Sequence, residues 1–354
     1  MSPTDGSFTL FGDGFKQPRN LNKDGSSSLY SESQADRLCF FILKGRDHMT
    51  KKIKSAELVS EFVAAFRCPL CKSSMRVVDL KSLICSKNHT FDFNKQGYVN
   101  LMTRSSTSHY KKELFEARRK IIMESDLYTF VHEAIARSIK EYMDVSFKPL
   151  MVADVGCGEG SHLQRILDEC KVSAMTGVGL DISKEGIAMA AKRYENQIWM
   201  VGDLATSPLA DQSFHVILNI LSPANYKEFK RILVEDGLVI KVIPRPHYLK
   251  ELRDELFDHN EKKFYKNDQT VSLFKKHLHL LDVQHLCYTK NLNKADLKHL
   301  VQMTPLAWSA DKGRIDAFIN RDSAEIMVDL EILVGVKKTF ATRMGAANHG
   351  KSID

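Results

Sequence analysis

The sequence predicts an α/β protein with a mostly parallel, doubly wound, Rossmann-like sheet, preceded by a small zinc-ribbon module. Three observations lead to this prediction. From residue 149 onward, short apolar strand patterns alternate with helical patterns. A glycine-rich loop, Gly156 to Gly160, follows the first of these strands directly. Ahead of the sheet, three cysteines and one histidine have the C-x2-C-x13-C-x3-H spacing of a metal site.

The segments before the sheet have three different patterns. Residues 1–48 are rich in Ser, Gly, Asp and Asn without sustained periodicity, and we expect them to be disordered. Lys51–Phe66 has a helix-compatible apolar spacing. Lys111–Met143 is expected to be helical, with a break near Ser125 and a basic face that includes Arg118.

Strands and helices then alternate along the chain, which is the order of a parallel sheet with crossover helices. The expected strands are 150–155, 175–180, 198–201, 213–220 and 237–243, and the expected helices are 161–169, 184–194, 224–233 and 247–258. Two late strands, 281–288 and 325–336, with a helix at 294–303 between them, are expected to form an antiparallel hairpin on the sheet edge.

The ligand pattern ahead of the sheet predicts a zinc site made of Cys68, Cys71, Cys85 and His89. Three Cys and one His fill a tetrahedral site and leave no open position, so the metal is expected to be structural. Two short extended stretches between Cys71 and Cys85 suit a ribbon hairpin. The alternative is that Cys68 and Cys71 are small buried apolar residues, but their paired spacing favours metal binding.

The composition indicates a chain that works outside membranes. Its 354 residues include seven cysteines, and three of them share the ligand pattern, so metal-bound thiolates fit better than a disulfide framework. The best early apolar run, Leu38–Leu43, is too short for a bilayer span or a signal-peptide core. We therefore expect a cytoplasmic protein with no membrane partner.

The net charge of +7 is concentrated in one part of the chain. Residues 49–150 hold 18 basic and 11 acidic residues, whereas the flanking segments are balanced. A basic surface around a zinc module suits a polyanion such as nucleic acid, because Lys and Arg release counterions from phosphates. A solvated lysine-rich surface explains the charge equally well, so charge alone leaves nucleic-acid binding open.

The loop after the first strand has the residues of a nucleotide-type cofactor pocket. Asp154 ends the strand, and Gly156, Gly158 and Gly160 let a ligand approach the backbone at a helix N-terminus. The G-x-G-x-G spacing differs from the dinucleotide motif G-x-G-x-x-G. Asp181 lies 21 residues beyond Gly160 at a strand end, where a carboxylate accepts both ribose hydroxyls.

A third acidic residue completes this set. Asp203 ends the third predicted strand, where it is placed to receive the adenine amino group of a cofactor. Over residues 150–245 the chain resembles the S-adenosylmethionine (SAM) pocket of Rossmann-like class I methyltransferases. The resemblance implies that Asp154 shapes the pocket around the amino-acid end of the cofactor. The alternative is a turn motif in an α/β protein that binds no cofactor.

Further motifs make the resemblance specific. In order, they are Cys68-Pro-Leu-Cys71, Ile84-Cys85, Phe91-Asp92, Gly97-Tyr98-Val99, Ala117-Arg118-Arg119, Gly179-Leu-Asp181 and Gln302-Met-Thr-Pro305 with Trp308. Over about residues 49–340 the chain resembles RlmA-type 23S ribosomal RNA (guanine-N1)-methyltransferases. Leu221–Asn225, Lys241–Pro244 and Glu331–Gly335 resemble the Gram-positive branch of that family. This resemblance implies methylation of guanine 748 in hairpin 35, with guanine 745 of the other branch as the alternative.

The resemblance also implies cofactors, partners and further site residues. Tyr128, Gly158 and Glu159 match family positions that contact SAM. A cofactor-contacting histidine of the family is replaced by Tyr248, with His247 one place earlier, and which of the two covers the cofactor is open. The implied cofactors are SAM and Zn²⁺, and the implied partner is 23S rRNA. A homodimer is left open.

Methylation of guanine N1 requires an unpaired or flipped base and loss of the proton on N1. The sequence identifies no convincing general base, so the catalytic residues are unknown. Asn219 and Tyr226, around the end of the fourth strand, are the candidates. Asn219 has an alternative role as the cap of the following helix.

The expected organisation has four parts: an extension (1–48), a zinc-binding RNA-recognition module (49–105), a helical linker (106–148) and a SAM-dependent methyltransferase domain (149–354). Met49 is the expected functional start, because the resemblance begins only after it. Two other functions stay open: a methyltransferase of a small molecule or protein, and a zinc-dependent RNA-binding protein without catalysis. The basic segment argues against the first, and the intact cofactor loop argues against the second.

Overall fold

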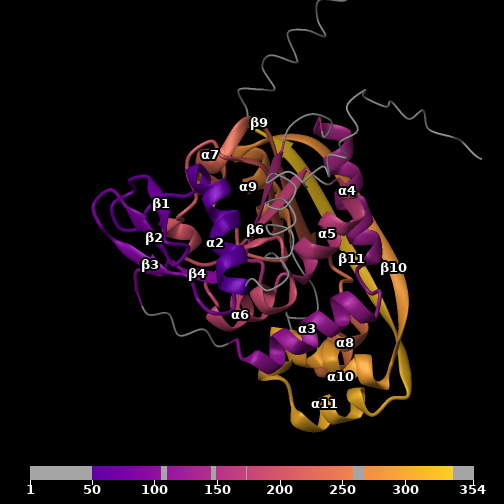
Figure 1. Cartoon of the computed structure of the whole chain (residues 1–354). Coiled ribbons are helices and arrows are strands. Elements are labelled where there is room, and N and C mark those ends of the chain that lie inside the picture. Colours follow the sequence, from indigo (N-terminus) through magenta and orange to yellow (C-terminus); the bar gives the residue numbers. More distant parts are fainter. Residues whose placement is uncertain (1–49, 105–109, 145–148, 173, 258–266, 338–354) are drawn as a thin grey trace, which may run out of the picture. The chain divides into compact units, whose positions relative to one another are not determined.

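An eight-stranded sheet runs through the part of the chain that the computed structural model describes, residues 50–104, 110–144, 149–172, 174–257 and 267–337 (Figure 1). These residues belong to one unit, Met49–Asp354. The predicted disordered extension, residues 1–48, lies outside the described residues. Within the described ranges, no helix is long and apolar enough to cross a bilayer.

Most neighbouring strands of the sheet are parallel, as the alternating pattern predicted. Its order is β10-β11-β9-β8-β5-β6-β7-β4. The parallel strands are β9 (Leu233–Pro244), β8 (Phe214–Ile220), β5 (Leu150–Val155), β6 (Met175–Asp181), β7 (Ile198–Val201) and β4 (Tyr98–Asn100). β11 (Ser323–Val336) is antiparallel to both β9 and β10 (His279–Asn293). The doubly wound fold and its antiparallel edge hairpin are therefore confirmed.

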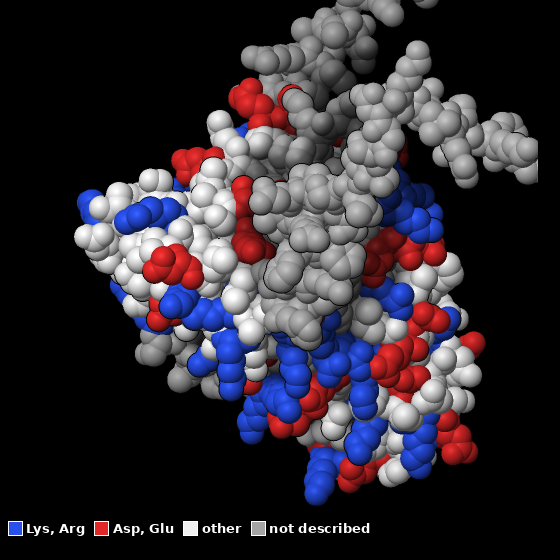
Figure 2. Space-filling model, in the orientation of Figure 1, with Lys and Arg blue, Asp and Glu red and all other residues white. Residues whose placement is uncertain are grey.

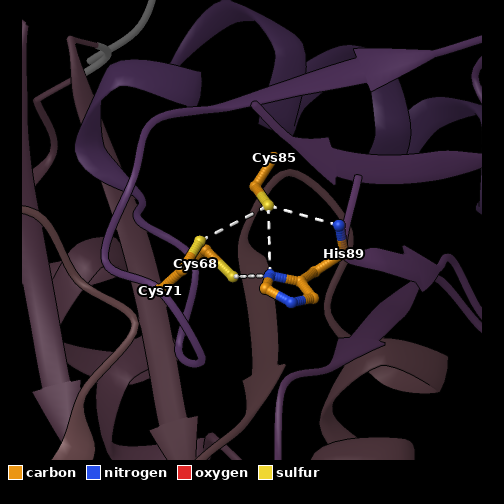
Figure 3. Close-up of side chains that lie close together, drawn as sticks. All are labelled: Cys68, Cys71, Cys85 and His89. Atoms are coloured by element: carbon orange, nitrogen blue, oxygen red, sulfur yellow. Dashed lines mark hydrogen bonds between the residues drawn. The ribbon is translucent and has the colours of Figure 1, made fainter. Parts of the chain in front are cut away.

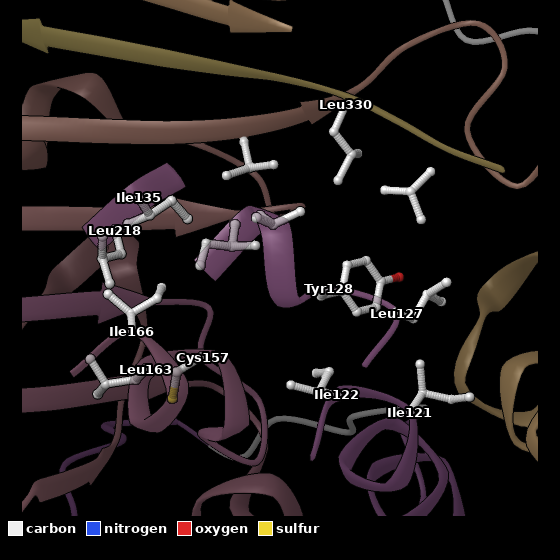
Figure 4. Packing of buried hydrophobic residues seen from close by; sticks show 14 of the residues in the cluster. Ile121, Ile122, Leu127, Tyr128, Ile135, Cys157, Leu163, Ile166, Leu218 and Leu330 are labelled. Carbon is white, nitrogen blue, oxygen red and sulfur yellow. The ribbon is translucent and has the colours of Figure 1, made fainter. Parts of the chain in front are cut away.

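Helices cover both faces of this sheet, and a hydrophobic core lies against each face. On β5, Val152 belongs to the core that includes α4 and α5, whereas Met151 and Ala153 belong to the core that includes α7 and α9. The helices are α4 (Thr129–Tyr142), α5 (Ser161–Cys170), α6 (Lys184–Arg193), α7 (Tyr226–Ile232), α8 (Lys250–Leu256) and α9 (Asp268–His277). Figure 4 shows the first core, where Leu163 and Ile166 of α5 lie on the same side of the view as Leu218 of β8. This alternation of side chains is what a strand covered on both sides requires.

The zinc-ribbon segment forms a small sheet of its own and adds a strand to the large one. It contains α2 (Lys51–Glu61), η1 (Val63–Ala65), and the antiparallel strands β1 (Met75–Val78), β2 (Ser82–Cys85) and β3 (Thr90–Asp92). The predicted hairpin is confirmed, but β4 was not predicted. β4 pairs in parallel with β7, with Tyr98 opposite Trp199. A backbone bridge between Phe66 and Leu209 joins the segment to the loop before β8.

Two helices, α3 (Lys112–Glu124) and α4, follow the ribbon segment and break at Ser125 as predicted. Ser125 Oγ donates to the backbone oxygen of Ile121 at 2.7 Å, and Asp126 has a positive φ of 56°, so the chain turns there. Both helices bury apolar side chains in the core of the sheet. The predicted basic face is wrong at Arg118, because this side chain points inward and pairs with the buried Glu159.

The C-terminal elements are only partly as predicted. α10 (Lys294–Met303) has the predicted bounds, because Asn293 caps it by accepting from the backbone N–H of Asp296 at 3.0 Å. β10 is longer than predicted, and α9, η4 (Pro305–Ser309) and α11 (Lys312–Ile319) were not predicted. In Figure 1, α3, α8, α10 and α11 lie together at the lower end of the view.

Candidate functional site

The four predicted metal ligands converge between the turn before β1 and the turn after β2. Their side chains point toward one another (Figure 3), and their ligand atoms all lie within 4.8 Å of one another. His89 Nδ1 lies 3.5 Å from Cys68 Sγ and 3.4 Å from Cys85 Sγ, and Cys71 Sγ lies 3.6 Å from Cys85 Sγ. Ligands at zinc distances in a tetrahedron are about 3.3–3.8 Å apart. The set therefore fits a closed, structural zinc site.

Local hydrogen bonds favour the thiolate forms that zinc binds. The hydroxyl of Ser73, 3.0 Å from Cys71 Sγ, together with the Ser73 backbone, lowers the pKa of Cys71 to about 7. The backbone N–H of His89 donates to Cys85 Sγ at 3.3 Å. Burial raises the pKa of Cys68, so zinc binding has to supply the free energy that ionises this thiol.

A cavity of about 1190 Å³ lies at the carboxyl ends of the parallel strands. This is where open α/β sheets bind their ligands. Of the predicted site residues, it is lined by Tyr128, Gly156, Gly158, Asp181, Asp203, Tyr226 and Tyr248. Five others do not line it: Asp154, Glu159, Gly160, His247 and Asn219. The structure thus brings most of the predicted cofactor residues together around one space.

The three loop glycines all have positive φ, between 61° and 80°, but for different packing reasons. A Cβ on Gly156 would lie 2.7 Å from Ser222 Oγ, and a Cβ on Gly158 would lie 2.7 Å from Arg118 Nη1. A Cβ on Gly160 would lie 2.3 Å from the ring of Trp199. Gly156 and Gly158 therefore make room for Ser222 and Arg118 at the cavity wall, whereas Gly160 makes room for a core tryptophan.

Asp181 ties the glycine loop to the second strand of the predicted pocket. Its Oδ2 accepts from the backbone N–H of Gly158 at 2.8 Å, and its Oδ1 accepts from that of Ser183 at 2.7 Å. Burial raises its pKa, against these hydrogen bonds. Each carboxylate oxygen can accept more than one hydrogen bond, so both can also serve a ligand in the cavity. Asp203 Oδ1 accepts from the backbone N–H of Ala205 at 2.8 Å and so begins the short helix after β7.

An ion pair between Arg118, which lines the cavity, and the buried Glu159 supports the loop. Arg118 of α3 donates through Nη1 to Glu159 Oε2 and, at 3.2 Å, to the backbone oxygen of Cys157. The Glu159 side chain is fully buried and does not line the cavity. Burial raises the pKa of Asp154 to about 7, although Arg118 opposes the shift. Sequence reasoning missed this role of Arg118.

Two tyrosines close another side of the cavity. The hydroxyl oxygens of Tyr128 and Tyr248 are 2.6 Å apart, and His162 of α5 packs edge-on against Tyr128 at 5.3 Å. His247 is exposed, and its backbone N–H donates to Asp329 Oδ2 at 3.0 Å. Of His247 and Tyr248, Tyr248 is the one that lines the cavity.

The two catalytic candidates have different surroundings. Asn219 is fully buried and donates to the backbone oxygens of Val155 and Pro223 at 3.3 and 3.1 Å. The alternative that Asn219 caps the next helix is wrong, because Asn225 Oδ1 accepts from the α7 backbone instead. Tyr226 lines the cavity, burial raises its pKa to about 12, and its hydroxyl has no hydrogen-bond partner within the described ranges.

The donor set and shape of this cavity fit SAM. Two loop glycines, Gly156 and Gly158, line the cavity ahead of a helix N-terminus, and two carboxylates stand at adjacent strand ends where a nucleoside's hydroxyl and amino groups need acceptors. Apolar and aromatic side chains make up much of the remaining wall. These residues lie on three successive strand ends, which agrees with the order in which the sequence presents them.

Comparison with known proteins gives two family matches. Residues 66–105 match the zinc-ribbon family described as "RlmA, N-terminal", and residues 152–237 match a methyltransferase domain. A Bacillus subtilis protein named "Putative 23S rRNA (guanine-N(1)-)-methyltransferase YxjB" is 42% identical over 77% of this chain and 97% of its own length. A Streptomyces fradiae 23S rRNA (guanine(748)-N(1))-methyltransferase is 31% identical over 70% of this chain and 88% of its own length.

Proposed function

We propose that this chain, which belongs to the family of RlmA-type 23S rRNA (guanine-N1)-methyltransferases, methylates a guanine in hairpin 35 of 23S rRNA. Guanine 748 is the favoured target and guanine 745 the next, because the S. fradiae relative is named for position 748. The observation that carries the proposal is one cavity that has Asp181 and Asp203 at strand ends on one side. On the other side it reaches an aromatic rim, the ring pair of Tyr110 and Trp308. Bound SAM supplies an electrophilic methyl group.

The cofactor end of the cavity is assigned from its hydrogen-bonding groups. Asp181 is proposed to accept from the ribose hydroxyls, and Asp203 from the adenine amino group, since both carboxylates line the cavity. The ion pair between Arg118 and Glu159 keeps the glycine loop, residues 156–160, in place. The groups proposed to face the cofactor directly are Gly156, Gly158, Tyr128 and Tyr248.

The substrate end is assigned from an exposed pair of aromatic rings. Tyr110 and Trp308 are 41% and 54% exposed, and their ring centroids are 5.5 Å apart. Tyr110 lines the cavity, as do Pro305 and Leu306 just before Trp308. Exposed rings of this kind stack on unpaired bases, at about 1–3 kcal/mol per base. We assign them to nucleotides beside the target guanine, which has to leave its stack to be methylated.

Basic side chains lie around this end of the molecule. Figure 2 shows Lys and Arg gathered over α6, α3 and α10, with acidic groups among them. The exposed cations of these helices include Lys112, Lys184, Lys192, Arg193 and Lys298. Such a surface holds a phosphate backbone by charge without reading its sequence. It supports RNA as the substrate over a small molecule.

The zinc segment is proposed to recognise the RNA while the sheet holds the cofactor. Its exposed cations include Lys72, Arg76, Lys81, Lys87 and Lys95, on the segment that carries the four converging metal ligands. The net positive charge of the chain comes from the residues around this segment. One basic surface on the zinc segment and another on α3, α6 and α10 would let the enzyme bind a folded hairpin on both sides of the target base.

Methylation mapping tests the proposed function. Purified enzyme, SAM and a hairpin 35 RNA should give 1-methylguanine, detected by a stop in reverse transcription and by mass of the digested nucleosides. Guanine→adenine changes at 748 and 745 in the RNA identify the position. Methyl transfer to guanine N1 at neither position would refute the target, and transfer to small molecules with no RNA dependence would support the alternative class.

The aromatic rim has a matched control on the same protein. Trp308→Ala is expected to weaken hairpin binding by about 5- to 100-fold and to leave SAM binding unchanged. Phe130 is as exposed, at 53%, and also packs against another ring, that of Tyr288, but it does not line the cavity. Phe130→Ala should therefore leave hairpin binding unchanged. Equal effects of the two changes would contradict the assignment.

A further inference from the structure

Lys241 is a buried cation-forming residue on the wall of the cavity. It lies on β9 opposite Asn219 of β8, it is 4% exposed, and it lines the cavity. No carboxylate forms an ion pair with it among the residues that the structure describes. Buried lysines normally have such a partner. A lysine without one, facing a ligand cavity, indicates chemistry on the ligand.

Two hydrogen bonds to the protein hold the Lys241 amine, and they leave its third position for the cavity. Its Nζ donates to Asn219 Oδ1 at 2.6 Å and to the backbone oxygen of Ser222 at 3.0 Å. Asn219 presents this oxygen because its own NH₂ group donates to the backbone oxygens of Val155 and Pro223. A neutral amine has two N–H donors and one lone pair. Both donors are used by the protein, so the lone pair is left for the cavity.

The surroundings bring the pKa of this amine down toward physiological pH. Burial alone lowers the pKa of Lys241 to about 8. The titratable groups on the neighbouring elements include Tyr226, Lys227, Glu228, Lys230 and Arg231 on α7, His215 on β8, Glu325, Asp329 and Glu331 on β11, and Asp154 on β5 beyond β8. None of them contributes to the shift. The amine therefore has no fixed counter-charge from these side chains.

We propose that Lys241 is the general base that removes the N1 proton of the target guanine, with Asn219 as its positioning residue. This inference rests on the proposed function. The N1–H proton moves to Nζ, which becomes an ammonium group. The electron pair released on N1 forms the new bond to the methyl carbon as the methyl–sulfur bond breaks and its electrons stay on sulfur. The proton is later lost to solvent.

This role gives Lys241 a property that a structural lysine lacks. A general base contributes about 10²–10⁴ in rate and works only when unprotonated. The single-turnover rate should therefore rise about tenfold per pH unit at low pH and level off above about pH 8. A lysine that merely tied β9 to the 221–225 loop would change cofactor or RNA binding and would leave the pH profile of the remaining activity as it was.

The experiment compares the zinc-bound full chain with Lys241→Met and Lys241→Arg. Methylation of hairpin 35 RNA is measured in single turnovers from pH 6 to 9, with SAM and RNA affinities measured separately. Both variants should lose at least about 100-fold in rate at pH 8, with affinities within about twofold, and the plateau should disappear. Arginine keeps the charge but does not accept a proton, so an active Lys241→Arg would overturn the role of base.

A readout without catalysis is taken on the same proteins. With ¹³C-labelled lysine, the NMR signal that is lost in Lys241→Met is assigned to Lys241 and titrated in the wild-type chain. A pKa near 8 supports the proposal, and one near 10.5 overturns it; the signal missing from Lys241→Arg gives the same assignment where Lys241→Met does not fold. Lys337→Met is the matched control. The Nζ of Lys337 donates to the backbone oxygen of Leu233 at the opposite end of β9, and Lys337 does not line the cavity.

Two failures remain distinguishable. If the wild-type chain methylates guanine N1 and Lys241→Met keeps its rate and pH profile, the inference about Lys241 is overturned and the proposed function stands. If the wild-type chain bound to zinc and SAM transfers no methyl group to guanine N1 in hairpin 35 or intact 23S rRNA, the proposed function is overturned, and the role of Lys241 falls with it.

Discussion

Removing Arg118 should test how the cofactor loop is held. Arg118 of α3 is 19% exposed and pairs with Glu159, whose side chain is fully buried. It also donates to the backbone oxygen of Cys157, just before the glycine that lines the cavity. Arg118→Met keeps most of the apolar stem of the side chain and removes the charge. Glu159 would then be a buried carboxylate without its cation.

The expected loss of stability follows from this burial. Leaving one partner of a buried pair uncompensated costs about 3–5 kcal/mol. At about 2 °C per kcal/mol for a chain of this size, the melting midpoint should fall by about 6–10 °C. SAM should bind more weakly as well, because the loop that lines the cavity loses its support. In the double variant Arg118→Met with Glu159→Gln, the buried charge is absent and much of the lost stability should return.

The assay is thermal unfolding of the four members of this double-mutant cycle, together with calorimetry for SAM. Lys112→Met is the control, since Lys112 pairs with Glu116 on the same helix but is 65% exposed. Exposed pairs contribute at most about 1 kcal/mol, so this variant should barely move the midpoint. If Arg118→Met behaves like Lys112→Met, the argument from burial is refuted.

Three further predictions concern the zinc site and two carboxylates. Cys85→Ser should abolish stoichiometric zinc binding, measured by metal analysis, and unfold the ribbon sheet, because the metal supplies much of its folding free energy. Asp181→Ala should weaken SAM binding at least tenfold in calorimetry, since the loop and the proposed ribose acceptor are lost together. The pKa of Asp154 is raised to about 7 in the fold, so the unfolded chain releases this proton first and stability falls as pH rises from about 4 to 7. Asp154→Asn should remove that fall, on the order of 4 kcal/mol, from pH-dependent unfolding curves.

Each of these predictions has an outcome that contradicts it. Cys287 is exposed and lies far from the ligands in the sequence, so Cys287→Ser should keep its zinc; equal zinc loss in both variants would argue against a specific site. Unchanged SAM affinity in Asp181→Ala would remove this residue from the pocket. Parallel stability curves for the wild type and Asp154→Asn between pH 4 and 7 would show that Asp154 is ionised throughout.

The elements that the sequence predicted well are those with long, regular patterns. β5 is apolar on both faces and is followed directly by glycines, so both of its bounds were predicted. β4 was missed because three residues are too few to show a period of two, and its pairing with β7 is long-range. α9 and α11, which were also missed, each bury a single side chain, Phe274 and Phe318.

The site residues that were missed act through packing and not through a motif. Arg118 was assigned to a basic face, yet it lies four positions after Leu114 and three before Ile121, which are both buried. Helical spacing alone could have placed it inward. Lys241 was noticed only as part of a family motif. Its significance depends on Asn219 across the sheet, and this pairing of β8 with β9 is a tertiary contact that local sequence does not contain.

The addition of β4 to the sheet has a consequence for how the protein can be divided. β4 covers the outer backbone edge of β7, with Tyr98, Val99 and Asn100 opposite three residues of that strand. A fragment that began at residue 149 would leave this edge open, and uncovered strand edges pair with other chains. Such a fragment should aggregate on expression, although it contains all the parallel strands from β5 to β9. By covering the edge of β7, the zinc-ribbon segment is therefore expected to keep the sheet from pairing with other chains.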